Sequence, residues 1–128
     1  MVQLVTEGVN IMVETFYQPA QSNPLNSEYL FAYRITIENR TIYPVRLLSR
    51  HWHILDSNGT HREVEGDGVV GEQPVINPGD SYQYTSGANL HSEIGKMYGT
   101  YQMENIFNKK KLTVRIPEFK LIVPAKLN

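Results

Sequence analysis

The chain has 128 residues, enough for one domain that buries a core without covalent cross-links. Hydrophobic residues make up 41% and charged residues 20%, as in folded globular proteins, and the formal net charge of −1 offers no attraction to a polyanion, which excludes nucleic acid as the main ligand. The absence of cysteine excludes disulfides, thiolate nucleophiles and cysteine-based zinc sites.

The N-terminal part predicts two strands joined by an exposed connection. Residues 10–18 alternate between two side-chain faces and predict the first strand. Pro19 and Pro24 lie in a polar stretch, residues 19–27, that predicts the connection. Residues 28–39 show the cleanest alternation in the chain, so we expect one face of that strand in the core and the other mostly in solvent.

The rest of the chain predicts further short strands. Residues 43–56 predict a long third strand, and the turn signal Asn58-Gly59 predicts that residues 61–65 pair back onto it. Residues 86–92 predict a second irregular connection. The remaining strands are predicted over residues 81–85, 96–104 and 112–116. Pro117 breaks the last of these, and residues 119–123 either continue or restart it at an edge, where proline is tolerated.

About seven to eight short strands, with no segment of helical period, predict an all-β domain over residues 1–128. Two packed antiparallel sheets, a β-sandwich, are the expected fold, and a closed barrel is the alternative because alternation does not separate the two. No apolar run approaches about 18 residues, and the N-terminus lacks the pattern of a signal peptide. We therefore expect no membrane span and a cytoplasmic location.

The most distinctive stretch contains the spacing G-x-G-x-x-G. In a dinucleotide-binding fold these glycines open a helix whose N-terminus holds the pyrophosphate, but here Pro74 and the turn at residues 77–80 follow, and no helix is predicted. Backbone N–H groups of such a loop can also hold an anion without a helix, although three acidic side chains would repel phosphate. The candidate ligand or partner loop consists of Glu65, Gly66, Asp67, Gly68, Gly71, Glu72 and Gln73.

Acidic residues and histidines suggest the opposite kind of ligand. The candidate metal ligands are His61, Glu63, Glu65 and Asp67, the first three at a spacing of two residues. Imidazole with carboxylates suits a divalent transition metal, while oxygens alone suit Mg²⁺. His51 and His53 also share a strand face and are placed across the hairpin from this group. The alternative is an exposed strand face whose histidines and glutamates are simply solvated.

Five stretches of the sequence resemble the ApaG family. They are residues 48–52, 65–74, 77–87, 97–103 and 116–119, with the sequences LSRHW, EGDGVVGEQP, NPGDSYQYTSG, MYGTYQM and IPEF. The resemblance implies a fibronectin-type-III or immunoglobulin-like sandwich, a bacterial protein associated with cobalt and magnesium resistance or efflux, and a domain reused in a eukaryotic F-box protein and a polymerase-delta-interacting protein. Ala88 stands where the family often has cysteine, which argues against an essential thiol, and residues 108–111 form an unusually basic turn.

We expect a non-catalytic module that binds an as yet unidentified protein partner, because no nucleophile elbow, paired-carboxylate motif or H-E-x-x-H helix is present. Its surface would comprise the loops at residues 65–74 and 85–91, with Arg50 and His51 as further contacts beside a core Trp52. The alternative is a regulator that binds a divalent cation or a nucleotide at the glycine-rich loop. No cofactor is expected, and the first and last strands offer edges through which two chains can pair as a homodimer.

Overall fold

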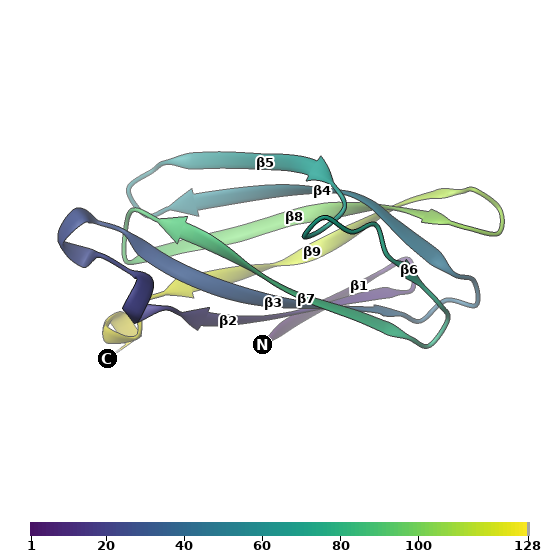
Figure 1. The fold of residues 1–128 in the computed structure, drawn as a ribbon, viewed down its shortest axis with the longest axis horizontal. Helices are drawn as coiled ribbons and strands as arrows, with labels where there is room; N and C mark the ends of the chain where they lie inside the picture. Colours follow the sequence, from purple (N-terminus) through teal and green to yellow (C-terminus); the bar gives the residue numbers. More distant parts are fainter. Residues whose placement is uncertain (128) are drawn as a thin grey trace.

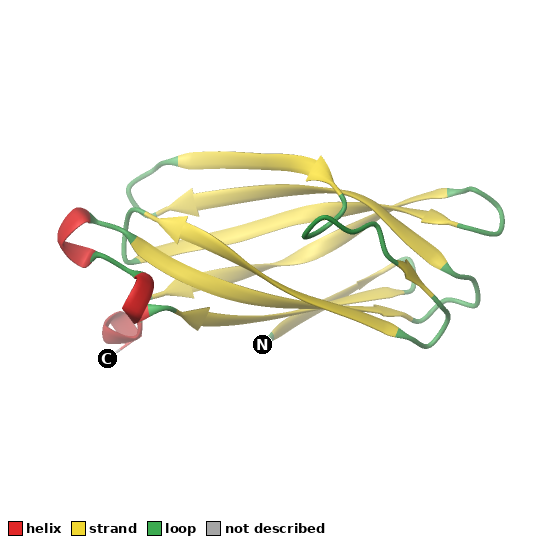
Figure 2. Cartoon of the chain, viewed as in Figure 1, coloured by secondary structure: helices red, strands yellow, loops and turns green. Residues whose placement is uncertain are grey.

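The computed structural model describes residues 1–127, which form two antiparallel sheets packed face to face (Figures 1 and 2). The first sheet has the order β1-β2-β3-β7, with β1 Val2–Thr6, β2 Val9–Tyr17, β3 Tyr29–Asn39 and β7 Ser81–Leu90. The second has the order β5-β4-β8-β9, with β4 Val45–Asp56, β5 His61–Asp67, β8 Ile94–Asn105 and β9 Lys111–Ile122, and the short β6 Val75–Ile76 also pairs with β4. Three short 3-10 turns, η1 Pro19–Gln21, η2 Pro24–Asn26 and η3 Pro124–Leu127, complete the described elements.

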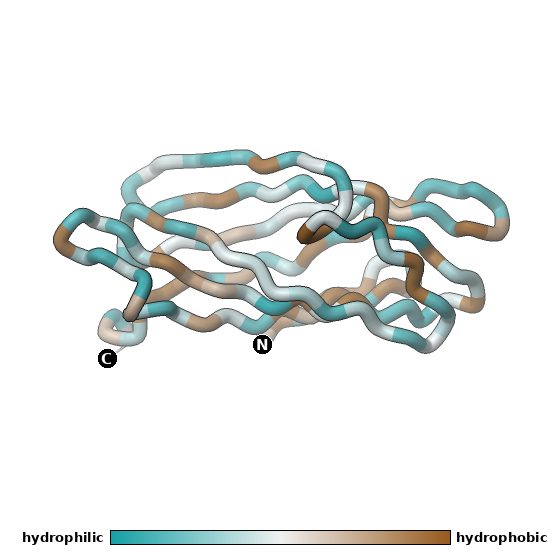
Figure 3. Tube along the Cα trace, in the orientation of Figure 1, coloured by the Kyte–Doolittle hydropathy of each residue, from teal (hydrophilic) through white to brown (hydrophobic). Residues whose placement is uncertain are grey.

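Strict alternation of side chains builds the core of the sandwich (Figure 3). From Phe31 to the end of β3 every second residue, including Ile35 and Ile37, is buried, while the intervening residues are half-exposed. On β4 of the facing sheet, Trp52 is 2% exposed and packs edge-on against Phe119 of β9. Because successive side chains of a strand point to opposite faces, burial of Trp52 places its neighbours on the outer face of the second sheet.

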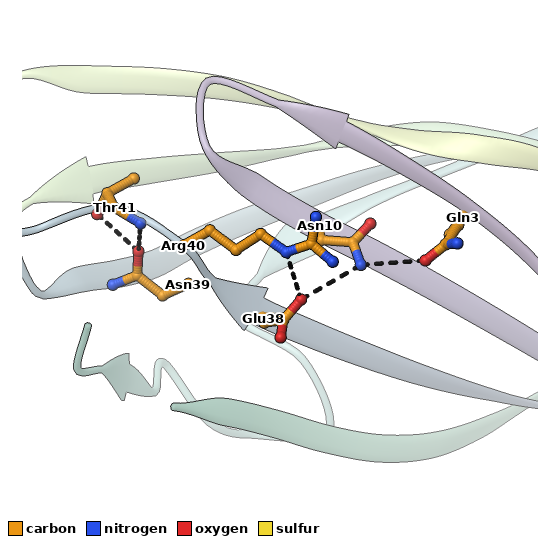
Figure 4. Close-up of polar contacts among 6 residues, drawn as sticks. All are labelled: Gln3, Asn10, Glu38, Asn39, Arg40 and Thr41. Atoms are coloured by element: carbon orange, nitrogen blue, oxygen red, sulfur yellow. Dashed lines mark hydrogen bonds and ion pairs between the residues drawn. The ribbon is translucent and has the colours of Figure 1, made fainter. Parts of the chain in front are cut away.

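A buried asparagine fixes one end of the sandwich (Figure 4). The amide of Asn39, fully buried at the end of β3, donates from Nδ2 to the carbonyl oxygens of Tyr43 (2.8 Å) and Ile76 (2.9 Å). Its Oδ1 accepts from the backbone N–H and the hydroxyl of Thr41, at 2.9 and 2.6 Å. All four hydrogen-bonding positions of the side chain are thus used, and they tie the loop between β3 and β4 to β6.

The two-sheet sandwich predicted from the alternation is confirmed, and the closed barrel is excluded by the separate sheets. The finer likeness to fibronectin type III or immunoglobulin domains, and the homodimer through sheet edges, stay predictions. The structure adds β1 at Val2–Thr6, which the sequence did not predict. Within residues 1–127, no helix combines the length and the apolar character that crossing a membrane requires.

One local prediction was wrong, and one that was left open is decided by the structure. Residues 86–92 were expected to be irregular, so residues 85–91 were expected to form an interaction loop, but β7 continues to Leu90 because its small residues pair in register with β3, Ala88 opposite Phe31. After Pro117 the last strand was expected either to continue or to restart at an edge, and β9 continues through the proline as an edge strand. The register of β8 shifts opposite the proline, between Met97 and Gly99, and this irregularity accommodates the missing N–H.

Candidate functional site

The outer face of the β5-β4-β8-β9 sheet carries most of the candidate residues. Two adjoining hollows lie on it, one of about 420 Å³ beside Arg50, Glu65 and Asp67, and one of about 360 Å³ beside His53 and Tyr98. His51 and Thr100 line both hollows. The sheet face is therefore a shallow polar surface centred on His51 and open to solvent.

Strand register brings histidines and glutamates together on this face. In the β4–β5 ladder His51 lies opposite Glu65, and His53 lies opposite Glu63. His61 begins β5 and lies opposite Leu55, one pair further along. Directly opposite residues of an antiparallel pair have Cβ atoms about 4.5–5.5 Å apart, so these polar side chains contact one another. We call the set the outer-face cluster: His51, His53, His61, Glu63 and Glu65.

The polar atoms of the outer-face cluster lie within contact distance. Glu63 Oε1 is 3.1 Å from His51 Nε2 and 3.4 Å from His53 Nδ1. Glu65 Oε1 is 3.2 Å from His51 Nδ1, and His61 Nε2 is 3.0 Å from His53 Nδ1. One ligand atom from each of His51, His53 and Glu63 can be chosen so that all three lie within 4.8 Å of one another.

The structure therefore changes the set of candidate metal ligands. Of the predicted ligands His61, Glu63, Glu65 and Asp67, Glu63 is joined by two histidines from the neighbouring strand. Asp67 lies opposite Ser49, at the far end of the ladder from His61. A site of oxygens alone, as Mg²⁺ prefers, would need the carboxylates to converge, whereas here each glutamate faces an imidazole.

Arg50 and His51, predicted as an interaction surface, point in opposite directions. His51 faces outward with 35% of its side chain exposed. Arg50 has the same parity as Trp52, and its Nη1 donates to the carbonyl oxygens of Asp67 and Gly68, both at 3.0 Å. The guanidinium thus anchors the start of the glycine-rich loop.

The glycine-rich loop closes mainly on the protein itself. The N–H of Gly68 donates to the carbonyl of Leu48 at 2.8 Å, and Val69 and Glu72 exchange two backbone hydrogen bonds. Gly68 has φ of +61°, and a Cβ there would lie 2.1 Å from the carbonyl oxygen of Glu72. A Cβ at Gly66 would lie 2.9 Å from the Arg50 guanidinium. At both positions the structure itself therefore favours glycine over a residue with a side chain.

Of the remaining predicted loop residues, one makes a hydrogen bond to the backbone of β4 and three are exposed to solvent. Gln73 Nε2 donates to the carbonyl of Leu48 at 2.8 Å. Asp67, Gly71 and Glu72 are exposed. The structure also adds Tyr98, Thr100 and Gln102 of β8 to the face, which were not among the predicted site residues. Their alternation with the buried Met97, Tyr101 and Met103 was the signal that could have identified them.

A second polar group lies inside the sandwich. The hydroxyls of Tyr84 on β7 and Tyr101 on β8 form a buried hydrogen bond between the two sheets. Burial raises the pKa of both phenols, and the hydrogen bond to Tyr101 partly opposes that effect at Tyr84. Neutral hydroxyls satisfying each other between sheets are a structural element, because solvent and ligands do not reach them.

An apolar surface lies at the end of the sandwich that carries the β3–β4 loop and the β8–β9 hairpin (Figure 1). Phe107 is 73% exposed and its ring stacks on Tyr43, with centroids 5.0 Å apart and planes at 9°. Ile42, next to Tyr43, is 79% exposed. We call Ile42, Tyr43 and Phe107 the end patch.

Basic side chains border the end patch. Lys111 Nζ donates to Glu104 Oε2 at 2.8 Å, and Arg46 lies opposite Glu104 in the β4–β8 ladder. The hydrogen bond from Lys111 lowers the pKa of Glu104, and the charges of Lys109 and Arg46 act in the same direction. Three cations therefore surround one carboxylate, which leaves an excess of positive charge beside the apolar residues.

Comparison with known proteins identifies related chains. A family model described as the ApaG domain matches residues 19–105. A protein of Brucella canis named Protein ApaG is 48% identical over 124 residues, covering 97% of this chain and 95% of that one, and its namesake in Sinorhizobium fredii is 44% identical over 125 residues, covering 98% and 95%. A crystal structure from Bordetella pertussis superposes with a TM-score of 0.87 at 41% identity, covering 91% of this chain and 94% of that one.

Proposed function

This chain belongs to the ApaG domain family, and we propose that it is a non-catalytic protein-interaction module that binds its partner with the end patch. The names of the matched family and relatives state no catalytic activity, and the proposal assigns none. Under this proposal, any effect on cobalt or magnesium resistance acts through the partner. The observation that carries the proposal is the exposed ring of Phe107 stacked on the half-buried Tyr43.

Exposed aromatic side chains on a rigid support are typical of binding surfaces, because they supply contact area at a small cost in side-chain entropy. The end patch has such a support. Asn39 holds the loop that carries Ile42 and Tyr43, and the N–H of Ile106 donates to the carbonyl of Pro44 at 3.0 Å, which joins the β8–β9 hairpin to the same loop. Tyr43 and Phe107 are thereby fixed in place before any partner arrives.

The charge around the end patch selects the kind of partner. Arg46, Lys109 and Lys110 are exposed, and the carboxylate of Glu104 is already paired with Lys111. Opposite charges across an interface accelerate encounter and disfavour wrong partners. We therefore assign as partner a protein segment that presents apolar side chains flanked by aspartate or glutamate.

A display library of random peptides, selected on the full-length chain, tests this assignment. We expect the enriched peptides to combine apolar and acidic residues, and to shift the backbone amide NMR signals of residues 41–44 and 105–110. Phe107→Ser is expected to weaken their binding at least tenfold, about 1.4 kcal/mol. Leu25→Ser, which alters a 98% exposed apolar residue at the η2 turn, is the matched control and should bind as the wild type does.

Charge reversal supplies the second arm of the test. The double variant Lys109→Glu, Lys110→Glu should lose the acidic peptides and select basic ones instead, since the apolar residues remain in place. Enriched peptides without acidic residues, or NMR shifts confined to the glycine-rich loop, would contradict the proposal and direct the search for a partner to the loop at residues 65–74.

A further inference from the structure

We propose that the outer-face cluster is a binding site for a divalent transition-metal ion, with His51 Nε2, His53 Nδ1 and Glu63 Oε1 as ligands and Glu65 as the support of His51. His61, whose Nε2 lies 3.0 Å from His53 Nδ1, is next to the proposed ligands. The proposal goes beyond the interaction function, because it concerns the outer face of the β5-β4-β8-β9 sheet and not the end patch. Two imidazoles and one carboxylate are a donor set suited to Zn²⁺ and its first-row neighbours.

The spacing of the three donor atoms already approaches that of a tetrahedral site. With metal–ligand bonds of roughly 2.0–2.1 Å, two ligands of a tetrahedral Zn²⁺ lie about 3.3 Å apart. Glu63 Oε1 is 3.1 Å from His51 Nε2 and 3.4 Å from His53 Nδ1. One ligand atom from each of the three residues can be chosen so that all lie within 4.8 Å of one another, and the two imidazoles have to turn toward each other to bind a single metal ion.

The hydrogen-bonding capacity of His51 favours a cation at Nε2. Its two ring nitrogens face the carboxylates of Glu63 and Glu65, at 3.1 and 3.2 Å. A neutral imidazole has one N–H, so it can donate to only one of the two. With a metal at Nε2 and the proton at Nδ1, both carboxylates are satisfied, which is the arrangement that metal-binding histidines commonly adopt with a supporting carboxylate.

The local charge balance leads to the same conclusion. Five glutamates of the described chain have a lysine or arginine within 4 Å: Glu14, Glu38, Glu93, Glu104 and Glu118. In contrast, the ion-pair contacts of Glu63 and Glu65 within residues 1–127 are to histidines alone. Two adjacent carboxylates on one strand repel each other, and a divalent cation between Glu63 and His51 would neutralise that repulsion.

Aromatic stacking restricts the two histidine side chains. His53 stacks on Tyr98 of β8, with ring centroids 4.8 Å apart and planes at 10°, and the His51 ring stacks on His53 at 4.6 Å. The backbones of the ligands are fixed by the β4–β5 ladder. Sites on paired strands are better defined than sites on loops, and little side-chain entropy remains to be lost on binding.

A bound ion would fasten the edge of the sheet. β5 pairs with β4 on one side and is an edge strand of its sheet, and most of its residues are exposed. A metal shared by His51 and His53 of β4 and by Glu63 of β5 adds a cross-strand link where few buried contacts exist. We therefore expect the backbone amides of β5 to exchange with deuterium more slowly when the metal is bound.

Isothermal titration calorimetry of the full chain with Zn²⁺ tests the proposal, and Mg²⁺ is the comparison ion. We expect one Zn²⁺ per chain and no saturable binding of Mg²⁺ at the same concentrations. His53→Phe keeps an aromatic ring against Tyr98 but removes the ligand nitrogen, and Glu63→Gln removes the charged oxygen. Each should weaken Zn²⁺ binding at least tenfold, and Glu65→Gln by about 10-fold to 100-fold through loss of the supporting carboxylate.

His91→Ala is the matched control, since His91 is the one histidine outside the cluster and is exposed. It should bind Zn²⁺ as the wild type does, and unfolding midpoints without metal should show that every variant is folded. The absence of one-to-one Zn²⁺ binding, wild-type affinity in His53→Phe, or an equal loss in His91→Ala would each overturn the proposal. Zn²⁺-induced NMR shifts at the imidazoles of His51 and His53 would support it, and shifts at His91 alone would overturn it.

Discussion

The outer faces of the two sheets carry cross-strand polar pairs of the same geometry but different chemistry. On the β1-β2-β3-β7 sheet, Arg34 lies opposite Glu14, and its Nε and Nη2 donate to the two carboxylate oxygens at 3.2 and 2.9 Å. On the β5-β4-β8-β9 sheet, His53 lies opposite Glu63 and His51 opposite Glu65. The first pair is closed, since a bidentate guanidinium matches a carboxylate in both shape and charge.

The second arrangement is open, because imidazoles provide fewer donors than the surrounding acceptors require. The ladder position of a residue therefore does not decide whether an exposed polar pair only stabilises the sheet or also offers a ligand site. The deciding property is whether the donors and acceptors of the pair are all used in hydrogen bonds between its two members. Four predictions, from the largest expected effect to the smallest, test the contrast between inward and outward residues and between closed and open polar groups.

Trp52→Ala should lower the free energy of unfolding by about 3–5 kcal/mol, because the indole fills the core between the sheets and its loss leaves a cavity. His51→Ala, one residue away but outward, should change it by no more than about 0.5 kcal/mol without metal. Urea-induced unfolding of both variants measures the difference. Comparable losses in the two variants would mean that the outer-face cluster is part of the stabilising core.

Asn39→Ala should lower the free energy of unfolding by about 2–4 kcal/mol. The Asn39 side chain makes four hydrogen bonds, and its loss leaves the buried carbonyl groups of Tyr43 and Ile76 without this donor. The same variant should weaken peptide binding at the end patch, since it releases the loop that carries Tyr43. Gln83→Ala, which removes an exposed hydrogen bond to Thr36, is the control and should be near neutral in both assays. Unchanged peptide binding in Asn39→Ala would show that the loop needs no such anchor.

Tyr101→Phe should lower the free energy of unfolding by about 1–2 kcal/mol, because the buried hydroxyl of Tyr84 loses its hydrogen-bond partner. Tyr98→Phe changes the same residue type on the outer face of the same strand and should shift the unfolding midpoint little. If Tyr98→Phe proves the more destabilising variant, the inward and outward tyrosines of β8 have been assigned the wrong roles.

Glu14→Gln tests the closed pair through pH. The hydrogen bond from Arg34 lowers the pKa of Glu14 below its ordinary value of 4.5, so the pair stabilises the folded state above the unfolded pKa and loses this effect as pH falls through the folded pKa. The wild type should therefore exceed Glu14→Gln in stability at about pH 7 and lose that advantage near pH 2. Glu28→Gln is the control, and a pH-independent difference for Glu14→Gln would contradict the role of the pair.

The sequence predicted the inward residues better than the outward chemistry. Alternation placed Phe31, Ile35 and Trp52 in the core, because burial acts on every second residue whatever the partner strand is. It missed β1, although Val2, Val5 and Thr6 favour a strand and β1 pairs with β2. It also missed the end of β7, where small residues have weak strand preference and the register with β3 supplies the structure instead. Gly87, for example, lies opposite Ala32 in the β3–β7 ladder, and this strand pairing keeps it in the strand.

The candidate site was predicted in outline but not in its atoms. Alternation placed His61, Glu63 and Glu65 on one face, with His51 and His53 across the hairpin. Which of them converge depends on the register, and the observed ladder sets Glu63 against His53 while it leaves Asp67 opposite Ser49. The register depends on how the turn at Asn58-Gly59 closes the hairpin, with Leu55 opposite His61. Arg50 shares the parity of the buried Trp52, but its hydrogen bonds to Asp67 and Gly68 become visible only in the structure.

The most direct test of the open cluster is a crystal structure with Zn²⁺ and anomalous difference maps on both sides of the zinc absorption edge. A single peak about 2.0–2.1 Å from His51 Nε2, His53 Nδ1 and Glu63 Oε1 is the predicted result. The closed pair of Arg34 and Glu14 should show no peak. Zinc bound only at His91, or absent from the outer face at saturating concentration, would contradict the central claim that unsatisfied cross-strand pairs make this face a metal site.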